Sequence, residues 1–281
     1  MLPDLLCPRT GRSLILAAVF CTALAFNACG KKGAERTVMV TGSSTIAPIL
    51  QDAATRYEAA HPGIRIEVQS GGSSRGITDT IAGIADLGMV SRALKDDEAT
   101  NLTPHLLARD GVCVIVHRDN PVNELDRNQL VDIYTKKVTR WKELGGPDAA
   151  IIVANKADGR STLEVFTHFL GLDPAEVKAD LIVGENLHVI HSVVGNANTI
   201  GYVSIGTALS EQAAGTPIKL LVTGGVAPTM VAVKDGSFPI TRPLHVVTAG
   251  DPSPEARAFL DYLMSGEIHD LIAKHFFVPV R

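Results

Sequence analysis

Short apolar segments alternate with amphipathic segments along most of this 281-residue chain. Residues 38–40 and 64–68 have the apolar pattern of short strands, and each is followed by a Gly- and Ser-rich loop and then by apolar residues at helical spacing. Apolar segments typical of strands recur at residues 151–153, 201–205 and 244–248. Because strand–loop–helix alternation is typical of a mostly parallel sheet covered by helices, the chain is predicted to be α/β.

The composition favours a globular fold and gives no reason to expect nucleic acid. Hydrophobic residues make up 46% of the chain and charged residues 20%, which suits a packed core. The 26 Lys and Arg against 30 Asp and Glu give a net charge of −4, and no basic block interrupts this balance. We therefore expect no nucleic-acid partner. At this length, one large or two smaller domains are expected.

The N-terminus has the pattern of an export signal. Arg9 and Arg12 precede an apolar run over residues 14–25, which is too short for a permanent membrane helix. The four cysteines include no C-x-x-C pair, so neither a zinc site nor a disulfide framework is predicted. Cys113, within an apolar segment, is expected to be a buried strand residue.

The end of this leader can be read in two ways. Ala28 directly precedes Cys29, as in a bacterial lipobox, whose cysteine is lipidated and becomes the new N-terminus. Ordinary cleavage after Ala25 would instead give a soluble secreted protein. We predict a lipoprotein-type signal peptide over residues 1–28 and a tether over residues 29–36. The working protein is expected in the periplasm or at the cell surface, held to the membrane by the lipid on Cys29.

Three loops combine Gly with Ser or Thr where a strand ends and a helix begins, at residues 42–45, 71–74 and 159–162. A helix start leaves N–H groups unpaired and carries a partial positive charge, so such loops are ready sites for an oxyanion. Because parallel strands end at one edge of a sheet, the three loops can converge. The residues alone predict an anion-binding α/β protein, with ordinary helix capping as the alternative for each loop.

The loops do not match the common enzyme templates. There is no G-x-x-x-x-G-K-[ST] phosphate loop and no G-x-S-x-G nucleophile turn. His188 and His191 lack the spacing and the Glu of a metalloprotease helix. We therefore predict no catalytic residues, no metal site and no cofactor.

The chain resembles the extracytoplasmic phosphate-binding proteins of PstS type that serve bacterial ABC importers. The resembling segments, spread over most of residues 37–280, are 40–48, 72–77, 85–92, 156–162 and 199–203. The resemblance implies the two-lobed periplasmic-binding-protein fold, in which each lobe is a mostly parallel sheet with flanking helices and two crossover strands join the lobes. The implied bounds are 37–116 plus 223–281 for lobe 1 and 117–222 for lobe 2, with crossings near 112–117 and 204–222.

The resemblance also implies a phosphate site between the lobes. The implied ligand-binding residues are Ser44, Thr45, Ser73, Ser91, Arg92, Arg160, Ser161 and Thr162, with Lys156 as a possible further ligand. Some family members have an Asp where Ser91 stands, and that Asp accepts a proton from bound phosphate. The choice between phosphate and sulfate therefore stays open. A site with Arg92 and Arg160 is expected to favour a divalent oxyanion, because Arg can hold two oxygens at once.

The implied function is capture of inorganic phosphate by a hinge movement and its delivery to the membrane permease of an ABC importer. We expect a monomer that is not an enzyme. Three alternatives remain: the same fold binding sulfate, molybdate or tungstate; a phosphate sensor; and an exported phosphatase.

Overall fold

The computed structural model describes residues 36–280. The predicted signal peptide over residues 1–28, the lipidation at Cys29 and nearly all of the predicted tether lie outside these residues. Within them, no helix combines the length and the apolar character that a membrane crossing requires. Cys113 is buried and lies in a strand that spans residues 103–117, as predicted.

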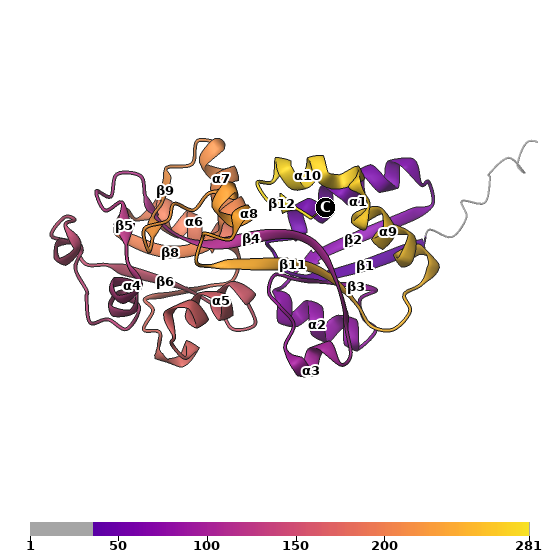
Figure 1. Cartoon of the computed structure of the whole chain (residues 1–281), viewed down its shortest axis with the longest axis horizontal. Coiled ribbons are helices and arrows are strands. Elements are labelled where there is room, and N and C mark those ends of the chain that lie inside the picture. The colour runs from indigo at the N-terminus through magenta and orange to yellow at the C-terminus, as the bar shows by residue number, and fades with distance from the viewer. Residues whose placement is uncertain (1–35, 281) are drawn as a thin grey trace, which may run out of the picture. The chain divides into compact units, whose positions relative to one another are not determined.

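One ten-stranded sheet organises the described chain (Figure 1). Its main path runs β2-β1-β3-β11-β4-β8-β6-β7, while β9 and β12 pair with β4. The strands of this sheet are β1 Arg36–Gly42, β2 Ile64–Ser70, β3 Leu87–Val90, β4 Thr103–His117, β6 Ile152–Lys156, β7 Leu181–Val183, β8 Thr199–Ser204, β9 Ile218–Leu220, β11 Thr241–Thr248 and β12 Val278–Pro279. A separate pair is formed by β5 Glu124–Leu125 and β10 Val222–Thr223.

Ten α-helices accompany the strands within residues 36–280. They are α1 Ala47–Ala60, α2 Ser73–Ile81, α3 Asp96–Ala99, α4 Arg127–Tyr134, α5 Ser161–Leu170, α6 Asn186–Gly195, α7 Ile205–Ala213, α8 Met230–Asp235, α9 Pro254–Met264 and α10 His269–Lys274. Local sequence explains several of their starts: Asp126 caps α4 in a capping box with Gln129, and Ser253 followed by Pro254 caps α9. The α/β fold with a curled, mostly parallel sheet is therefore confirmed.

The parallel strands form two groups joined by antiparallel strands. On one side β1 pairs in parallel with β2 and β3, and on the other β6 pairs in parallel with β7 and β8. β4 and β11 run between the groups, as Figure 1 shows. The N-terminal part of β4 pairs with β11, and its residues 112–116 pair with β8. The two groups of parallel strands correspond to the two lobes that the resemblance implies.

Each group of strands has its own hydrophobic core. The first core takes its side chains from β1, β3, β11, α1 and α9, with Leu50, Met89 and Phe259 almost fully buried. The second core takes its side chains from β4, β6, β8, α4, α5 and α6, and includes Trp141 and Phe166. In the second core, Phe166 stacks on Tyr202 with ring centroids 3.9 Å apart.

The chain returns from the second core to the first between α8 and β11. Phe238 and Ile240 pack in the second core, whereas Leu244 and Val246 pack in the first. This return is later in the chain than the second crossing predicted from the sequence, near residues 204–222. The reason is that α8 and the segment after it cover the second core instead of turning back at once. The exact lobe bounds stay a prediction.

Candidate anion-binding site

A small cavity lies where the loops after β1, β2 and β3 meet the loop after β6. Its lining residues are Ser43, Ser44, Thr45, Gly72, Ser73, Ser91, Lys156, Arg160, Ser161, Thr162, Gly184 and Asn186. All predicted site residues except Arg92 are therefore brought together. The space open to the centre of a water-sized sphere is about 10 Å³, on the order of what one water molecule needs.

Helix starts surround this cavity. α1 begins just after Ser44 and Thr45, α2 begins at Ser73, α5 begins at Ser161 and α6 begins at Asn186. Each start contributes unpaired N–H groups and part of the helix dipole's positive charge. The Gly/Ser/Thr loops predicted from the sequence thus meet at one place. The loops after β1 and β2 lie at the carboxyl edge of one parallel group, and the loop after β6 lies at the carboxyl edge of the other group, across the cavity.

Glycine allows the loop before α2 and the loop before α5 to touch. Gly72 has a φ of 98°, and a Cβ there would lie 2.8 Å from the carbonyl oxygen of Gly159 and 3.0 Å from Cδ of Arg160. The backbone N–H of Ser74 donates a hydrogen bond to the same Gly159 oxygen, at 3.2 Å. A larger residue at position 72 would therefore push the two loops apart.

The hydroxyl groups of the first lobe form a connected set. Ser43 Oγ donates to Ser91 Oγ at 2.9 Å, and the N–H of Ser91 donates to Ser73 Oγ at 3.1 Å. From the second lobe, Ser161 Oγ is buried and has no hydrogen-bond partner among residues 36–280. An unsatisfied buried hydroxyl at the cavity wall is a ready partner for a polar ligand.

Lys156 reaches this cavity from the end of β6 and is only 2% exposed. Its Nζ donates a hydrogen bond to Asn186 Oδ1 at 3.1 Å. Burial lowers the pKa of this amine from 10.5 to about 7; the nearby carboxylate of Glu185 opposes the change, and Arg242 and Arg160 add to it. Within the described part of the chain, no carboxylate comes within 4.0 Å of Nζ.

Arg160 is held by a carboxylate of its own lobe. Its Nη1 lies 2.6 Å from Oε1 of Glu185, the residue before α6. Burial would raise the pKa of Glu185, but the Ser44 hydroxyl and the Arg160 guanidinium together hold it below its usual value. Glu185 is therefore ionised at neutral pH and neutralises much of the charge that Arg160 brings to the cavity.

Arg92 is placed elsewhere. Its guanidinium is paired with Glu98 at 2.7 and 2.8 Å, and its Nε lies 3.1 Å from Oε2 of Glu164. It does not line the cavity, and its predicted role as a ligand remains without support from this geometry.

Arg242, in β11, was not predicted from the sequence as part of the site, although it contacts the cavity wall. This residue is 3% exposed, and it donates to Oδ2 of Asp110 at 3.0 and 2.8 Å. It also donates to Thr45 Oγ1 at 3.1 Å and to Thr162 Oγ1 at 3.0 Å, so it links hydroxyls from the two lobes. The available signal was weak: Arg242 is the second residue of β11, and Asp110 follows Arg109 in the middle of β4. Ser43, Gly184 and Asn186 were also missed.

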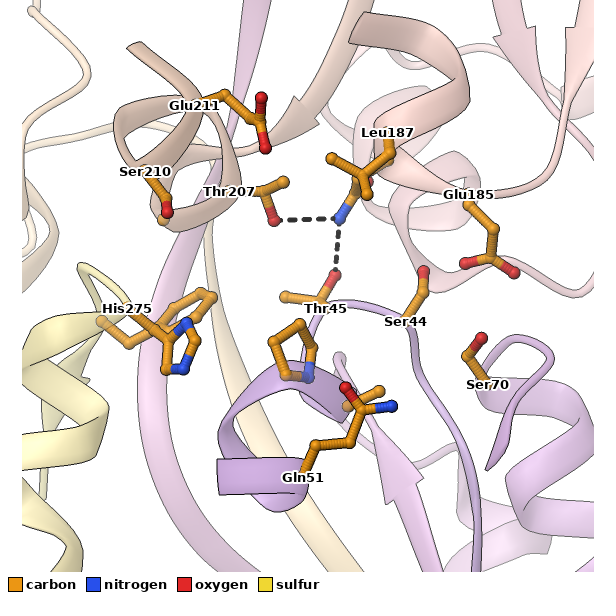
Figure 2. A pocket seen from close by; sticks show the side chains of 15 residues that line it. Ser44, Thr45, Gln51, Ser70, Glu185, Leu187, Thr207, Ser210, Glu211 and His275 are labelled. Atoms are coloured by element: carbon orange, nitrogen blue, oxygen red, sulfur yellow. Dashed lines mark hydrogen bonds between the residues drawn. The ribbon is translucent and has the colours of Figure 1, made fainter. Parts of the chain in front are cut away.

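A larger cavity adjoins the first, with about 320 Å³ open to the centre of a water-sized sphere. The two share Ser44, Thr45 and Asn186. Figure 2 shows the larger cavity with two hydrogen bonds at its wall: Nδ2 of Asn186 donates to Thr45 Oγ1 at 3.2 Å and to Thr207 Oγ1 at 3.3 Å. These bonds join α6 and α7 to the start of α1, so both cavities lie between the lobes.

Comparison with known proteins gives a consistent result. The family model described as "PBP superfamily domain" matches residues 30–267. The phosphate-binding protein PstS of Bacillus subtilis is 29% identical over 259 residues, which cover 90% of this chain and 84% of that protein. PstS of Staphylococcus haemolyticus is 30% identical over 217 residues, covering 73% of this chain and 68% of that protein.

Solved structures point the same way. A protein from Clostridium perfringens, solved with bound phosphate and described as a phosphate ABC transporter substrate-binding protein, has a TM-score of 0.81 and 32% identity. The match covers 88% of this chain and all of that one. An ABC-type phosphate transport receptor from Vibrio cholerae has a TM-score of 0.71 and 30% identity, covering 86% of this chain and all of that one.

Proposed function

Since this chain belongs to the PBP superfamily, we propose that it is an extracytoplasmic solute-binding protein that captures inorganic phosphate between its two lobes. One observation carries the proposal: hydroxyl, amine and guanidinium groups from both lobes converge on a single cavity at which several helices begin. The names of the relatives from Bacillus subtilis and Clostridium perfringens support phosphate as the anion.

The proposed ligand groups divide between the lobes. Lobe 1 offers the hydroxyls of Ser44, Thr45, Ser73 and Ser91, and lobe 2 offers Lys156, Arg160, Ser161 and Thr162. Micromolar affinity corresponds to about −8 kcal/mol. Several charge-assisted hydrogen bonds at about 1.5–3 kcal/mol each can offset the loss of anion hydration and reach that range.

Capture in this proposal requires the lobes to move. The room for about one water molecule is smaller than a tetrahedral oxyanion, so the proposal requires the lobes to separate for the ion to enter and to close around it. Within residues 36–280 the chain passes between the cores in β4, in the segment from α8 into β11 and between Phe277 and Val278, so bending of these segments would open the cleft. Contacts made only in the closed state would then favour closure over a bound anion.

The proposal includes the later steps implied for this class of protein. The closed, loaded form would dock on the membrane permease of an ABC importer and release phosphate there. The protein would act as a monomer and without catalysis, held to the membrane through a lipid on Cys29.

A second candidate is the same capture with another oxyanion, such as sulfate. The observation that favours it is the lining itself: among the described residues, the cavity wall includes hydroxyls and cations but no carboxylate. An ionised acceptor in the wall would favour an anion that can donate a proton. Without such an acceptor, the wall does not discriminate against an anion that has no proton to donate, such as sulfate.

Calorimetry of the purified full-length chain against phosphate, sulfate, molybdate and tungstate tests both candidates. Phosphate is expected to bind most tightly, and a tighter anion would replace it in the proposal. A phosphate-ester turnover assay checks the exported phosphatase. Arg160→Ala should weaken phosphate binding at least tenfold, because a charged donor leaves the wall, whereas Arg140→Ala, which removes an exposed Arg of the same lobe, should not. An unchanged affinity in Arg160→Ala would remove Arg160 from the site.

A further inference from the structure

A cluster of ion pairs joins the two lobes beside the anion cavity. Arg92 follows β3, which packs in the first core, whereas Glu164 lies in the first turn of α5, which packs in the second. Oε2 of Glu164 lies 3.1 Å from Nε of Arg92 and 3.0 Å from Nζ of Lys95. Because the partners belong to different lobes, this contact exists only while the lobes are together.

Arg92 is prepared for this contact by its own lobe. Glu98 binds it through two oxygens at 2.7 and 2.8 Å, and the carbonyl of Ala93 accepts a third hydrogen bond at 2.9 Å. The Arg92 side chain is 7% exposed and that of Glu164 is 26% exposed. An ion pair that is partly shielded from water, with one partner already fixed, stabilises more than an exposed pair between two mobile side chains.

Glu164 is also rigidly connected to the cavity. It lies in the same helical turn as Ser161 and Thr162, which line the cavity wall. A force that draws Glu164 toward Arg92 therefore draws the start of α5 over the anion. The first turn of α5 therefore carries both the ion-pair residue Glu164 and the cavity-lining residues Ser161 and Thr162.

We propose that Glu164 is a positioning residue for anion capture, which latches the lobes by pairing with Arg92 and Lys95 and does not touch the anion. The inference rests on the proposed function. Because the latch closes after the anion has entered, it slows dissociation and leaves association almost unchanged. Pairing with Glu164 also explains why the Arg92 side chain lies outside the cavity wall.

The latch predicts an effect opposite in sign to that of the electrostatic field. Glu164 is a negative charge next to a site for an anion, so its neutralisation by Glu164→Gln should, by the field alone, speed association and tighten binding. If Arg92 were itself a ligand, releasing it from Glu164 should likewise leave binding unchanged or tighter. Only a latch makes the neutral variant bind more weakly.

The test uses purified full-length protein, inorganic phosphate, calorimetry and stopped-flow kinetics. In Glu164→Gln we expect the dissociation rate to rise at least fivefold, the association rate to change less than twofold and the affinity to fall accordingly. Lys95→Met should act in the same direction but less, since the Lys95 side chain is 59% exposed. The matched control is Glu255→Gln, because Glu255 lies in the first turn of α9 and pairs with Arg36, where both partners belong to lobe 1.

A measurement on the unmodified chain keeps the test independent of folding in the variants. Raising the salt concentration from 50 to 500 mM should speed phosphate dissociation from the wild type, because salt screens a partly exposed ion pair. The latch is overturned if the rate of phosphate dissociation from the wild type does not change with salt, or if Glu164→Gln binds phosphate equally well or better. In either case the proposed function stands. If the wild type binds no phosphate, the proposed function itself fails.

Discussion

Replacing Lys156 by Met should stabilise the ligand-free protein and at the same time remove most of its affinity for phosphate. The Lys156 side chain lies at the cavity wall, and its amine has one hydrogen bond, to Asn186. Burial lowers its pKa from 10.5 to about 7. A residue whose charged form is disfavoured in the folded state works against folding, and such residues are common in binding sites.

The size of the effect follows from linkage. A fall in pKa from 10.5 to about 7 corresponds to roughly 5 kcal/mol at about 1.4 kcal/mol per pKa unit. Opening of the lobes would return water to the amine and relieve part of this cost, so we expect Lys156→Met to add about 2–5 kcal/mol to the free energy of unfolding. The Met side chain fills nearly the same volume, so no large cavity offsets the gain.

The pH dependence has a definite sign. Between the folded-state pKa of about 7 and the unfolded value of 10.5, the unfolded chain binds the proton and the folded chain does not. Wild-type stability therefore rises with pH across this window, by up to about 1.4 kcal/mol per pH unit from this one group. Below pH 7 both states are protonated and the full cost is present. The advantage of Lys156→Met should thus be largest at pH 6 and shrink toward pH 9.

Urea unfolding of both proteins at pH 6, 7.5 and 9, without phosphate, measures this difference directly. Lys178→Met, which removes an exposed lysine of the same lobe, serves as the control and should show no such trend. Adding phosphate at 1,000 times its dissociation constant should stabilise the wild type by about 4 kcal/mol and Lys156→Met by much less. The reasoning is refuted if the variant is less stable than the wild type, or if its advantage does not depend on pH.

Two further substitutions test the frame around the cavity. Arg242→Met should lower the free energy of unfolding, measured in urea, by about 3–5 kcal/mol, because it leaves the buried Asp110 carboxylate unpaired. Adding Asp110→Asn should recover part of this loss. Full stability of the Arg242→Met protein would contradict a buried pair. Gly72→Ala should weaken phosphate binding at least tenfold in calorimetry, since its Cβ would lie 2.8 Å from the Gly159 oxygen. An unaltered affinity there would mean that these two loops need not touch.

The elements of the site that could be predicted from the sequence are those that depend on short segments. The loops at residues 42–45, 71–74 and 159–162 carry their own signal, because Gly, Ser and Thr next to a helix start either cap the helix or offer donors to an anion, and three such loops in one chain favour the second use. The parallel strands, predicted from the periodicity, explain why the loops after β1 and β2 lie at one edge. The loop after β6 meets them because the two lobes face each other, which no local pattern encodes. This is why eight of the nine predicted site residues line one cavity although they come from distant parts of the chain.

The arginines could not be assigned in the same way. A cation in a loop can pair with any carboxylate that the fold brings near, and Glu164 is far from Arg92 in the sequence. Arg242 reaches the cavity because β11 inserts antiparallel between β3 and β4, a long-range pairing that no local pattern encodes. The packing of α8 against the second core is also a long-range contact, and it places the return crossing later in the chain than the sequence suggested.

The pairing of these arginines changes how the site must hold an anion. Among residues 36–280, Arg160, Arg242 and Arg92 each have a carboxylate partner, namely Glu185, Asp110 and Glu98. Their charges are therefore largely compensated before any ligand arrives. Among the same residues, Lys156 is the basic side chain of the cavity wall with no carboxylate within 4.0 Å, and a bound anion would favour its protonated form over the neutral form that burial favours.

A bound anion would then be held mainly by directed hydrogen bonds from hydroxyls and helix starts, with one amine supplying the uncompensated charge. Directed donors select an ion by the positions of its oxygens, whereas uncompensated charge attracts any anion. The paired arginines thus fix the positions of Thr45 and Thr162 and of the lobe interface. Ion pairs thus position the lobes, whereas other groups hold the anion. Removing the negative charge of Glu164 is therefore expected to weaken the binding of a negative ligand, because Glu164 acts on the position of the lobes.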